Sequence, residues 1–247
     1  LLCLTLLAVG PAAAQTPTNG WISPTTYVSG NPLVADSAEY NIEIIFRGTN
    51  WTTPLKEAFI RSAEAMSQYI VGDLPAAPFA GRMIDDLTIN AYLQAIDGSG
   101  RQLGVGTYGV QRANGLPISG TMRMDQADAP RWDSVDMFDD LVMHEMFHVL
   151  GFGHLWAQKG LITDQATNPT FSGPLANAAH PGDALIPIER IAGSAYHWRE
   201  VVFRNELMTT SVTSYINNDL SYMTIASLGD MGYAVIPEAN YVPPPFI

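Results

Sequence analysis

The segment with the clearest chemistry is Met143-His-Glu-Met-Phe-His148, in which two histidines lie four residues apart. Side chains four positions apart share one face of an α-helix, so His144 and His148 can bind one metal ion through their imidazoles. Glu145 follows the first histidine and can reach a water molecule at such an ion. Because the chain has only 5 histidines among 247 residues, a chance match to this pattern has a probability well under about one per cent.

Zinc is the metal that best suits two imidazoles, a third protein ligand and an open position. It lowers the pKa of a bound water towards about 7 and stabilises negative charge on a carbonyl oxygen. Glu145 would act as the general base when this water attacks a peptide carbonyl, and would then pass the proton to the leaving amine. The pattern therefore predicts a zinc-dependent peptide hydrolase in which Glu145 is the catalytic residue.

The residues alone leave the third zinc ligand open. His154 completes the spacing H-E-x-x-H-x-x-G-x-x-H, in which Gly151 ends the helix so that a later segment can return to the metal. A downstream glutamate, such as Glu189 or Glu200, would instead give a thermolysin-like arrangement, although Gly151 argues against it. A fourth protein ligand is not expected, because it would occupy the position that water needs.

Several elements must position these side chains. The helix that carries the two histidines is expected to begin after a capping residue, Asp136, and to end near Leu150. Residues 155–196 are rich in Gly, Pro, Asn and Ala without a sustained period, which indicates a long irregular insertion. An extended lead-in is expected at 15–37. The remaining expectations are strands at 40–46 and 87–96, a turn at 97–100, a helix from Thr53-Pro54 to about Gly72, and a helix at 221–231 that Gly232 closes.

Composition restricts the class of protein. A chain of 247 residues with 47% hydrophobic and 15% charged residues can form a large core in one domain or in two lobes around a cleft. Asp and Glu number 24 against 12 Lys and Arg, which gives a formal charge of −12. This balance argues against nucleic acid or an anionic membrane as a partner, and it predicts that strongly acidic substrates are disfavoured.

The first residues indicate export. Residues 1–14 form a short apolar run that ends in small residues, which is typical of part of a signal peptide and too short to span a bilayer. Cys3, the only cysteine, lies inside this run, so the mature chain would have no disulfide and no cysteine ligand. We therefore expect a secreted, extracellular, monomeric protein without a membrane span.

The chain resembles the leishmanolysin-like zinc metallopeptidases of the metzincin clan, in their bacterial secreted form. The similar segments extend from about Ile42 to Tyr233, and the most specific are the zinc motif and Glu206-Leu-Met-Thr209. The supporting segments are Ile84-Asp-Asp-Leu-Thr-Ile89, Ile96-Asp-Gly-Ser-Gly100, residues 118–125, His197-Trp-Arg-Glu200 and residues 220–233.

This resemblance implies an α+β fold of metzincin type. Its N-terminal lobe, at about 38–153, would hold a mixed twisted sheet and the zinc-binding helix. A smaller C-terminal lobe, which with the insertion covers about 154–235, would hold a helix and a Met-turn at Met208 below the metal. In this family the third histidine follows a long insertion and stands eleven residues before that methionine, which nominates His197. The implied ligands of Zn²⁺ are therefore His144, His148 and His197, with His154 near the site.

Together these observations predict a secreted zinc endopeptidase that acts on protein or peptide substrates, with residues 15–247 as the metallopeptidase domain. The alternative from another class is a non-catalytic, zinc-stabilised adhesin or binding module that kept the fold. The presence of Glu145 argues against this alternative, because structure alone would not require a carboxylate at that position.

Overall fold

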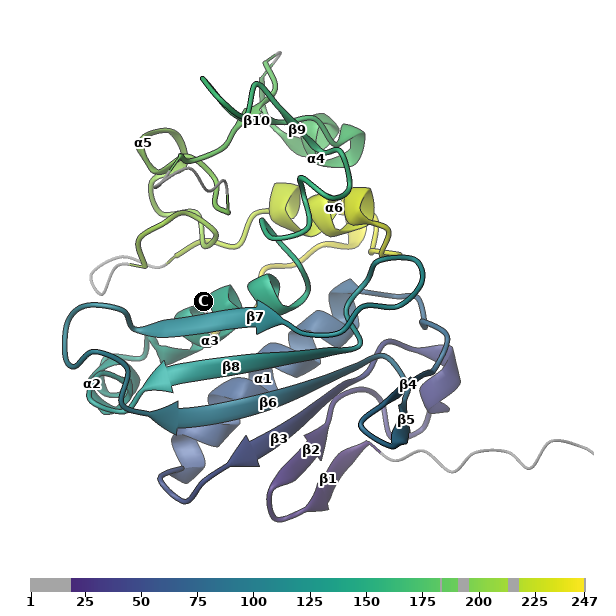
Figure 1. The fold of residues 1–247 in the computed structure, drawn as a ribbon, viewed down its shortest axis with the longest axis vertical. Coiled ribbons are helices and arrows are strands. Elements are labelled where there is room, and N and C mark those ends of the chain that lie inside the picture. The colour runs from purple at the N-terminus through teal and green to yellow at the C-terminus, as the bar shows by residue number, and fades with distance from the viewer. Residues whose placement is uncertain (1–18, 183, 191–195, 213–217, 247) are drawn as a thin grey trace, which may run out of the picture.

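The computed structural model describes residues 19–182, 184–190, 196–212 and 218–246. The expected signal segment 1–14, with Cys3, lies outside these residues. A sheet with helices on one face forms an N-terminal lobe, and shorter elements form a C-terminal lobe above it in the view of Figure 1. None of the described helices has the length and apolar character that a bilayer crossing requires.

The N-terminal lobe is built on a mixed, six-stranded sheet, which fits the expected α and β content. Its strands β3, β6 and β8 run parallel, whereas β1, β2 and β7 are antiparallel to their neighbours. In spatial order the strands are β1 (Gly20–Ser23), β2 (Thr26–Val28), β3 (Ile42–Arg47), β6 (Leu87–Gln94), β8 (Ser119–Asp125) and β7 (Gly104–Tyr108). The strands predicted at 40–46 and 87–96 are thus confirmed, and β7 is an edge strand.

The lead-in expected to be merely extended folds into a hairpin. β1 pairs with β2, and the Trp21 ring packs edge-on against Tyr27 with their centroids 5.6 Å apart. Pro, Thr, Ser and Gly dominate the composition of 15–37 and concealed these two short strands. The signal that was present is the cluster of aromatic and β-branched residues in Trp21-Ile22 and Tyr27-Val28.

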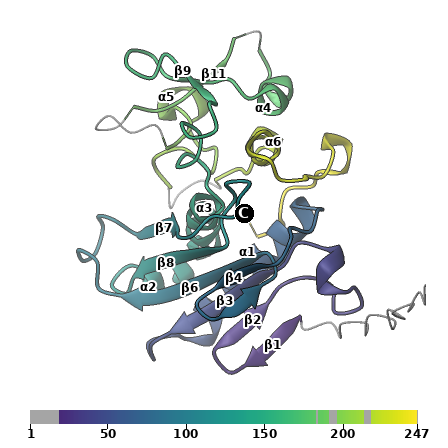
Figure 2. The same cartoon turned by 45° about the vertical axis from the view of Figure 1, so that its right-hand side comes forward.

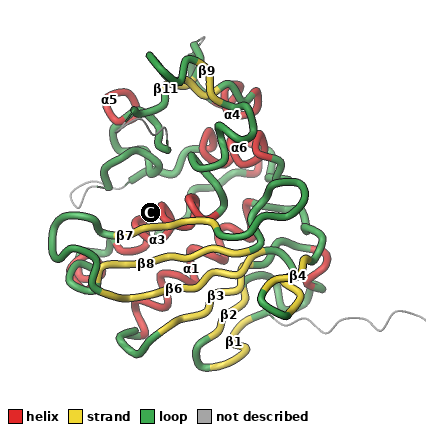
Figure 3. Tube along the Cα trace, viewed as in Figure 1, coloured by secondary structure: helices red, strands yellow, loops and turns green. Residues whose placement is uncertain are grey.

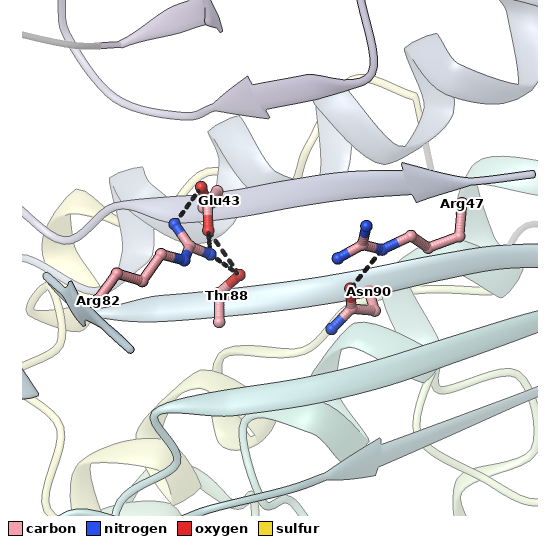
Figure 4. Close-up of polar contacts among 5 residues, drawn as sticks. All are labelled: Glu43, Arg47, Arg82, Thr88 and Asn90. Atoms are coloured by element: carbon pink, nitrogen blue, oxygen red, sulfur yellow. Dashed lines mark hydrogen bonds and ion pairs between the residues drawn. The ribbon is translucent and has the colours of Figure 1, made fainter. Parts of the chain in front are cut away.

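The two faces of the sheet differ because side chains alternate along each strand. Ile42 and Ile44 of β3 face the helices and are fully buried. The opposite face is polar, as Figure 4 shows: Glu43 forms an ion pair with Arg82 and accepts a hydrogen bond of 2.6 Å from the Thr88 hydroxyl. A small hairpin, β4 (Ala77–Phe79) and β5 (Arg82–Ile84), supplies this arginine.

Two long helices cover the apolar face, α1 (Thr53–Tyr69) and α3 (Phe138–Val149). All twelve residues of α3 are buried, because this helix lies between α1 and the edge strand β7. The Arg61 side chain of α1 donates two hydrogen bonds to the Asp139 carboxylate, at 2.7 and 2.8 Å, and so fixes the first turn of α3 against α1. A short helix, α2 (Ala129–Ser134), precedes α3.

The predicted capping role of Asp136 is wrong. Met137 is the residue before the first turn of α3, and no side chain caps that turn. Asp136 has a φ of 60°, a left-handed conformation that connects the end of α2 to α3. Asp136 does not cap α3 because it lies in the short connection between two helices that follow each other closely.

The C-terminal lobe consists largely of loops, which Figure 3 shows in green, with short elements between them. Its longest helix is α6 (Tyr222–Met231), which confirms the prediction for 221–231: the Ser221 side chain accepts a hydrogen bond from Thr224 N–H, and Gly232 ends the helix with a φ of 115°. The described part of the insertion carries only β9 (Ile162–Thr163), β10 (Thr170–Phe171), α4 (Pro174–Ala179) and β11 (Ile186–Pro187). Figure 2 separates α4 from α6 and shows α5 (Glu200–Phe203) on the other side of this lobe.

An aromatic cluster forms the core of this lobe. Trp156 and Trp198 are fully buried and stack with their ring centroids 4.7 Å apart, and Phe152 and Phe171 pack on both. The indole N–H of Trp198 donates a hydrogen bond of 2.8 Å to the Thr224 hydroxyl of α6. The cluster therefore joins the insertion, the segment after it and the last long helix.

The chain crosses between the lobes twice. It leaves the N-terminal lobe after α3, and after α6 it returns to pair with the end of α1 through an isolated bridge between Ile70 and Val235. The backbone N–H of Val71 donates to the carbonyl of Ala234 at 2.8 Å. A short 3-10 helix, Glu238–Asn240, follows. Another short 3-10 helix, Asp36–Ala38, lies between β2 and β3.

Replacing Trp156 by alanine should lower the free energy of unfolding by about 3–5 kcal/mol, because it opens a cavity in this aromatic cluster. Trp21→Ala is the matched control: that side chain is 51% exposed, so its loss should cost clearly less. Urea denaturation of both variants measures the difference. Equal losses would contradict the role given to the cluster.

Candidate metal centre

Three histidines from two lobes meet at one point. His144 and His148 lie on α3, and His197 lies in the segment between the insertion and α5. Their Nε2 atoms are 3.1 Å apart for the pair on α3, 3.0 Å for His148 and His197, and 3.2 Å for His144 and His197. One ligand atom from each could therefore hold a single metal ion.

Hydrogen bonds to the backbone decide which ring nitrogen of each α3 histidine carries the proton. The Nδ1–H of His144 donates to the carbonyl of Leu207 at 2.7 Å, and the Nδ1–H of His148 donates to that of Phe152 at 3.1 Å. With Nδ1 protonated, the Nε2 atom of each neutral ring is an acceptor. Two acceptors that face each other at 3.1 Å repel, and a cation bound by both would remove this repulsion.

The three imidazoles are neutral at pH 7, which is the form that binds metal. Burial lowers the pKa of His144 to about 4. Burial also lowers the pKa of His197 to about 3, with a further decrease from the neighbouring His144. The pKa of His148 lies well below its usual value for the same two reasons.

The geometry of this donor set fits a tetrahedral ion. Nitrogen ligands at about 2.0–2.1 Å from a tetrahedral zinc ion lie about 3.3 Å from one another, close to the observed 3.0–3.2 Å. Three neutral nitrogens in this arrangement suit zinc, although other divalent ions of the first transition series also bind imidazole. The three histidines could therefore hold a metal ion.

The end of α3 positions His148. The N–H of Gly151 donates to the carbonyl of His148, and the N–H of Phe152 donates to that of Phe147, both at 3.0 Å. This pair of bonds is a Schellman motif, which needs a left-handed residue, and Gly151 has a φ of 100°. The turn brings the Phe152 carbonyl back to the Nδ1–H of His148, so the role predicted for Gly151 is confirmed.

A second glycine admits the third histidine. A Cβ atom on Gly153 would lie 2.3 Å from the carbonyl oxygen of Tyr196, so only glycine lets the segment before His197 pass this close. Backbone hydrogen bonds hold His197 and Trp198 in place. The N–H of Glu189 donates to the carbonyl of His197 at 2.9 Å, and the N–H of Trp198 donates to that of Met208 at 3.0 Å.

The Glu206–Thr209 segment forms a tight turn against the histidines. The N–H of Thr209 donates to the carbonyl of Glu206 at 3.1 Å, and Met208 inside the turn is fully buried. The buried Glu206 carboxylate accepts from Met208 N–H at 2.6 Å and from the Ser221 hydroxyl at 2.7 Å, which ties the turn to the start of α6. This turn supplies the Leu207 carbonyl that orients His144.

Glu145 lies beside the three imidazoles and is 7% exposed. Its carboxylate accepts a hydrogen bond from the backbone N–H of Gly106 on β7. Burial raises the pKa of Glu145 to about 7, and the hydrogen bond from Gly106 opposes this rise. A Cβ atom on Gly106 would lie 2.0 Å from the Glu145 carbonyl oxygen, so glycine is what allows β7 to approach α3.

The histidines and Glu145 open into a cleft of about 680 Å³. β7 and the loop before it line one side, and Tyr196 and residues 210–212 of the C-terminal lobe line the other. Because β7 is the edge strand of the sheet, no described strand pairs with its outer side, where the Gly106 N–H is bonded to Glu145. An extended chain could lie along it.

The structure places the competing third ligands elsewhere. His154 lines the same cleft, but its ring packs on Tyr196 with centroids 4.5 Å apart, and it does not belong to the group of ligand atoms. The Glu189 carboxylate accepts from the N–H of Glu200, and the Glu200 carboxylate accepts from the Thr210 hydroxyl at 3.1 Å. Of these candidates, His197 is the side chain that meets the two histidines of α3.

A second group of possible ligands, Asp73, Asp85 and Asp86, lies at the opposite end of the sheet. Its most buried member has a structural role, because the Asp86 carboxylate accepts backbone hydrogen bonds of 2.7 Å from Asn41 and from Leu74. These bonds join the starts of β3 and β6 to the loop after α1. The histidine cluster is therefore the stronger metal site of the two.

No model of a known protein family matches this chain, and no curated protein is significantly similar to it. The interpretation of the site therefore depends on its residues and their geometry.

Sequence reasoning missed the glycines that let the parts of the site come together. Gly104 and Gly106 of β7 both face Glu145, and Gly153 faces the segment before His197. Nothing in the local sequence states which distant residue each glycine accommodates. The available signal was the run of small residues Gly104-Val-Gly106 before a strand pattern, since glycine in a strand often marks a close backbone approach.

His197→Ala should lose stoichiometric metal, whereas His154→Ala should keep one ion per chain, because only the first removes a nitrogen from the cluster. Elemental analysis of each purified variant after zinc loading and desalting measures the metal content. The opposite pattern, with metal lost from His154→Ala and kept by His197→Ala, would show that the shorter spacing supplies the ligand.

Met208→Leu should keep one metal ion per chain and should lower the free energy of unfolding by about 1.5 kcal/mol or less, because it conserves volume in a packed position. The backbone atoms of the turn, which make its contacts to Glu206 and Trp198, are unchanged by this substitution. Metal analysis together with urea denaturation tests this. Loss of the metal would show that the thioether itself is a ligand.

Proposed function

We propose that this protein is a secreted zinc-dependent endopeptidase of the leishmanolysin-like, metzincin type. The observation that carries the proposal is the position of the buried Glu145 carboxylate beside three convergent imidazole nitrogens in one open cleft. The mixed sheet, the helix with two histidines and the tight turn at Met208 are consistent with the resemblance in the sequence. Export is proposed from the apolar residues 1–14.

The zinc ion, when bound by His144, His148 and His197, would lower the pKa of a water molecule and polarise a substrate carbonyl. The chain supplies the proton transfers. Glu145 accepts a proton from the attacking water and delivers it to the nitrogen of the leaving amine, as the C–O bond forms and the C–N bond breaks. A carboxyl group with a pKa raised to about 7 by burial is suited to both steps near neutral pH.

The remaining residues orient the reacting groups. The carbonyls of Leu207 and Phe152 hold the rings of His144 and His148 in the tautomer that presents Nε2 to the cleft. The edge strand β7 offers a substrate in extended conformation a surface for pairing.

Glu145→Gln should keep one zinc ion per chain and should lose about 10²- to 10⁴-fold of the rate of peptide hydrolysis, because the amide cannot accept the proton. Cleavage of fluorescently labelled casein, with zinc content measured on the same preparation, tests this. Glu57→Gln is the matched control, since that side chain is exposed on α1 and does not line the cleft. It should cleave at the wild-type rate.

A zinc-loaded wild-type protein that cleaves no protein or peptide would favour the non-catalytic binding module. Near wild-type cleavage by Glu145→Gln would instead contradict the role of the carboxylate. Removal of the metal by a chelator should abolish activity, and addition of zinc should restore it.

A further inference from the structure

The charge inside the cleft is opposite to the charge of the chain. The formal net charge is −12, yet the described residues that line the cleft include two arginines, Arg101 and Arg131, and a single carboxylate, Glu145. An anionic group that enters the cleft therefore meets a locally positive surface.

Both arginines lie at the end of the cleft where β7 begins. Arg101 belongs to the loop before β7, and Arg131 belongs to α2. The buried carboxylate of Asp128 joins these two elements, because it accepts hydrogen bonds from Gly100 N–H at 2.9 Å and from the Ser99 hydroxyl at 3.0 Å. The loop that carries Arg101 and the helix that carries Arg131 are thus fixed to each other.

Neither guanidinium is used within the described chain. The ion pairs found there are Arg61 with Asp139 and Arg82 with Glu43, and both lie outside the cleft. Arg101 and Arg131 are exposed, so their charges are available to a ligand. The opposite end of the cleft, by contrast, is aromatic, with Tyr196 packed on His154.

We propose that Arg101 and Arg131 select substrates that carry a carboxylate on the C-terminal side of the cleaved bond; this rests on the proposed peptidase function. The side follows from strand pairing. Antiparallel pairing is the more stable kind, and a peptide antiparallel to β7 directs its C-terminal part towards the start of that strand, where the arginines lie. The planar guanidinium group binds carboxylates through paired hydrogen bonds.

The carboxylate has two possible sources, an Asp or Glu side chain and the C-terminus of a peptide. Four matched fluorogenic peptides separate them. The first has Glu on the C-terminal side of the cleaved bond and an amidated end, and the second replaces this Glu by Gln. The third keeps the Gln but has a free terminal carboxylate, and the fourth has Glu only on the N-terminal side.

At low ionic strength the zinc-loaded protein should cleave the first peptide with a kcat/KM about three- to tenfold above that of the second, as expected for one or two exposed charge pairs. The fourth peptide should resemble the second, and high salt should reduce the ratio towards one. An advantage of the third peptide over the second would assign the selected carboxylate to the chain end. Equal kcat/KM values for the first three peptides would overturn the proposal.

Variants locate the effect. In the double variant with Arg101→Gln and Arg131→Gln, the ratio of kcat/KM between the first and second peptides should fall to about one. Arg123→Gln, which removes an exposed arginine of β8 that does not line the cleft, should keep the wild-type ratio. A ratio that persists in the double variant, or that falls equally in Arg123→Gln, would show that these two arginines do not select the carboxylate.

A binding measurement separates this proposal from the proposed function. Fluorescence anisotropy with the zinc-loaded Glu145→Gln variant compares the affinities of the first two peptides without cleavage. If the wild-type protein cleaves no peptide but the variant still binds the Glu peptide at least threefold more tightly, the peptidase function fails and the charge selection stands. Equal binding of both peptides contradicts the charge selection whatever the activity.

Discussion

The convergence of three imidazole Nε2 atoms on one point is the constraint on which the rest of this structure depends. The two histidine rings of α3 cannot donate a hydrogen bond to each other, because the single N–H of each ring, at Nδ1, already donates to a backbone carbonyl. The contact between their Nε2 atoms is therefore unfavourable by itself, and a bound cation would relieve it. The turn after α3 and the turn at Leu207 hold the rings in this arrangement. Both lobes therefore contribute backbone carbonyls that orient the histidines.

Local periodicity was enough to predict the elements that carry most of the site. The spacing of His144 and His148 gave their shared helical face, and Gly151 gave the sharp end of the helix. Helix α6 could be predicted because Ser221 and Gly232 mark its two ends. In each case the determining contacts lie within a few residues of one another along the chain, where sequence patterns carry information.

Contacts between distant segments could not be predicted in the same way. Spacing alone nominated His154, whereas the resemblance nominated His197. The approach of His197 depends on Gly153, which allows Tyr196 to pass. The edge position of β7 follows from the order of strands in the sheet, which no single strand encodes. Asp136 was misjudged because its left-handed backbone reflects the close succession of two helices.

The second crossing between the lobes bears on how the cleft can respond to a ligand. Residues 234–236 are paired with the end of α1. Two segments of the chain therefore connect the lobes: one after α3 and one after α6. Moving the C-terminal lobe away from the sheet would strain this second connection and its backbone hydrogen bonds, which opposes a wide opening of the cleft. If the protein acts on peptides as proposed, most of the conformational entropy lost on association falls on the incoming chain. Flexible segments that are already unfolded would suit such a cleft, whereas a folded domain would first have to release a strand.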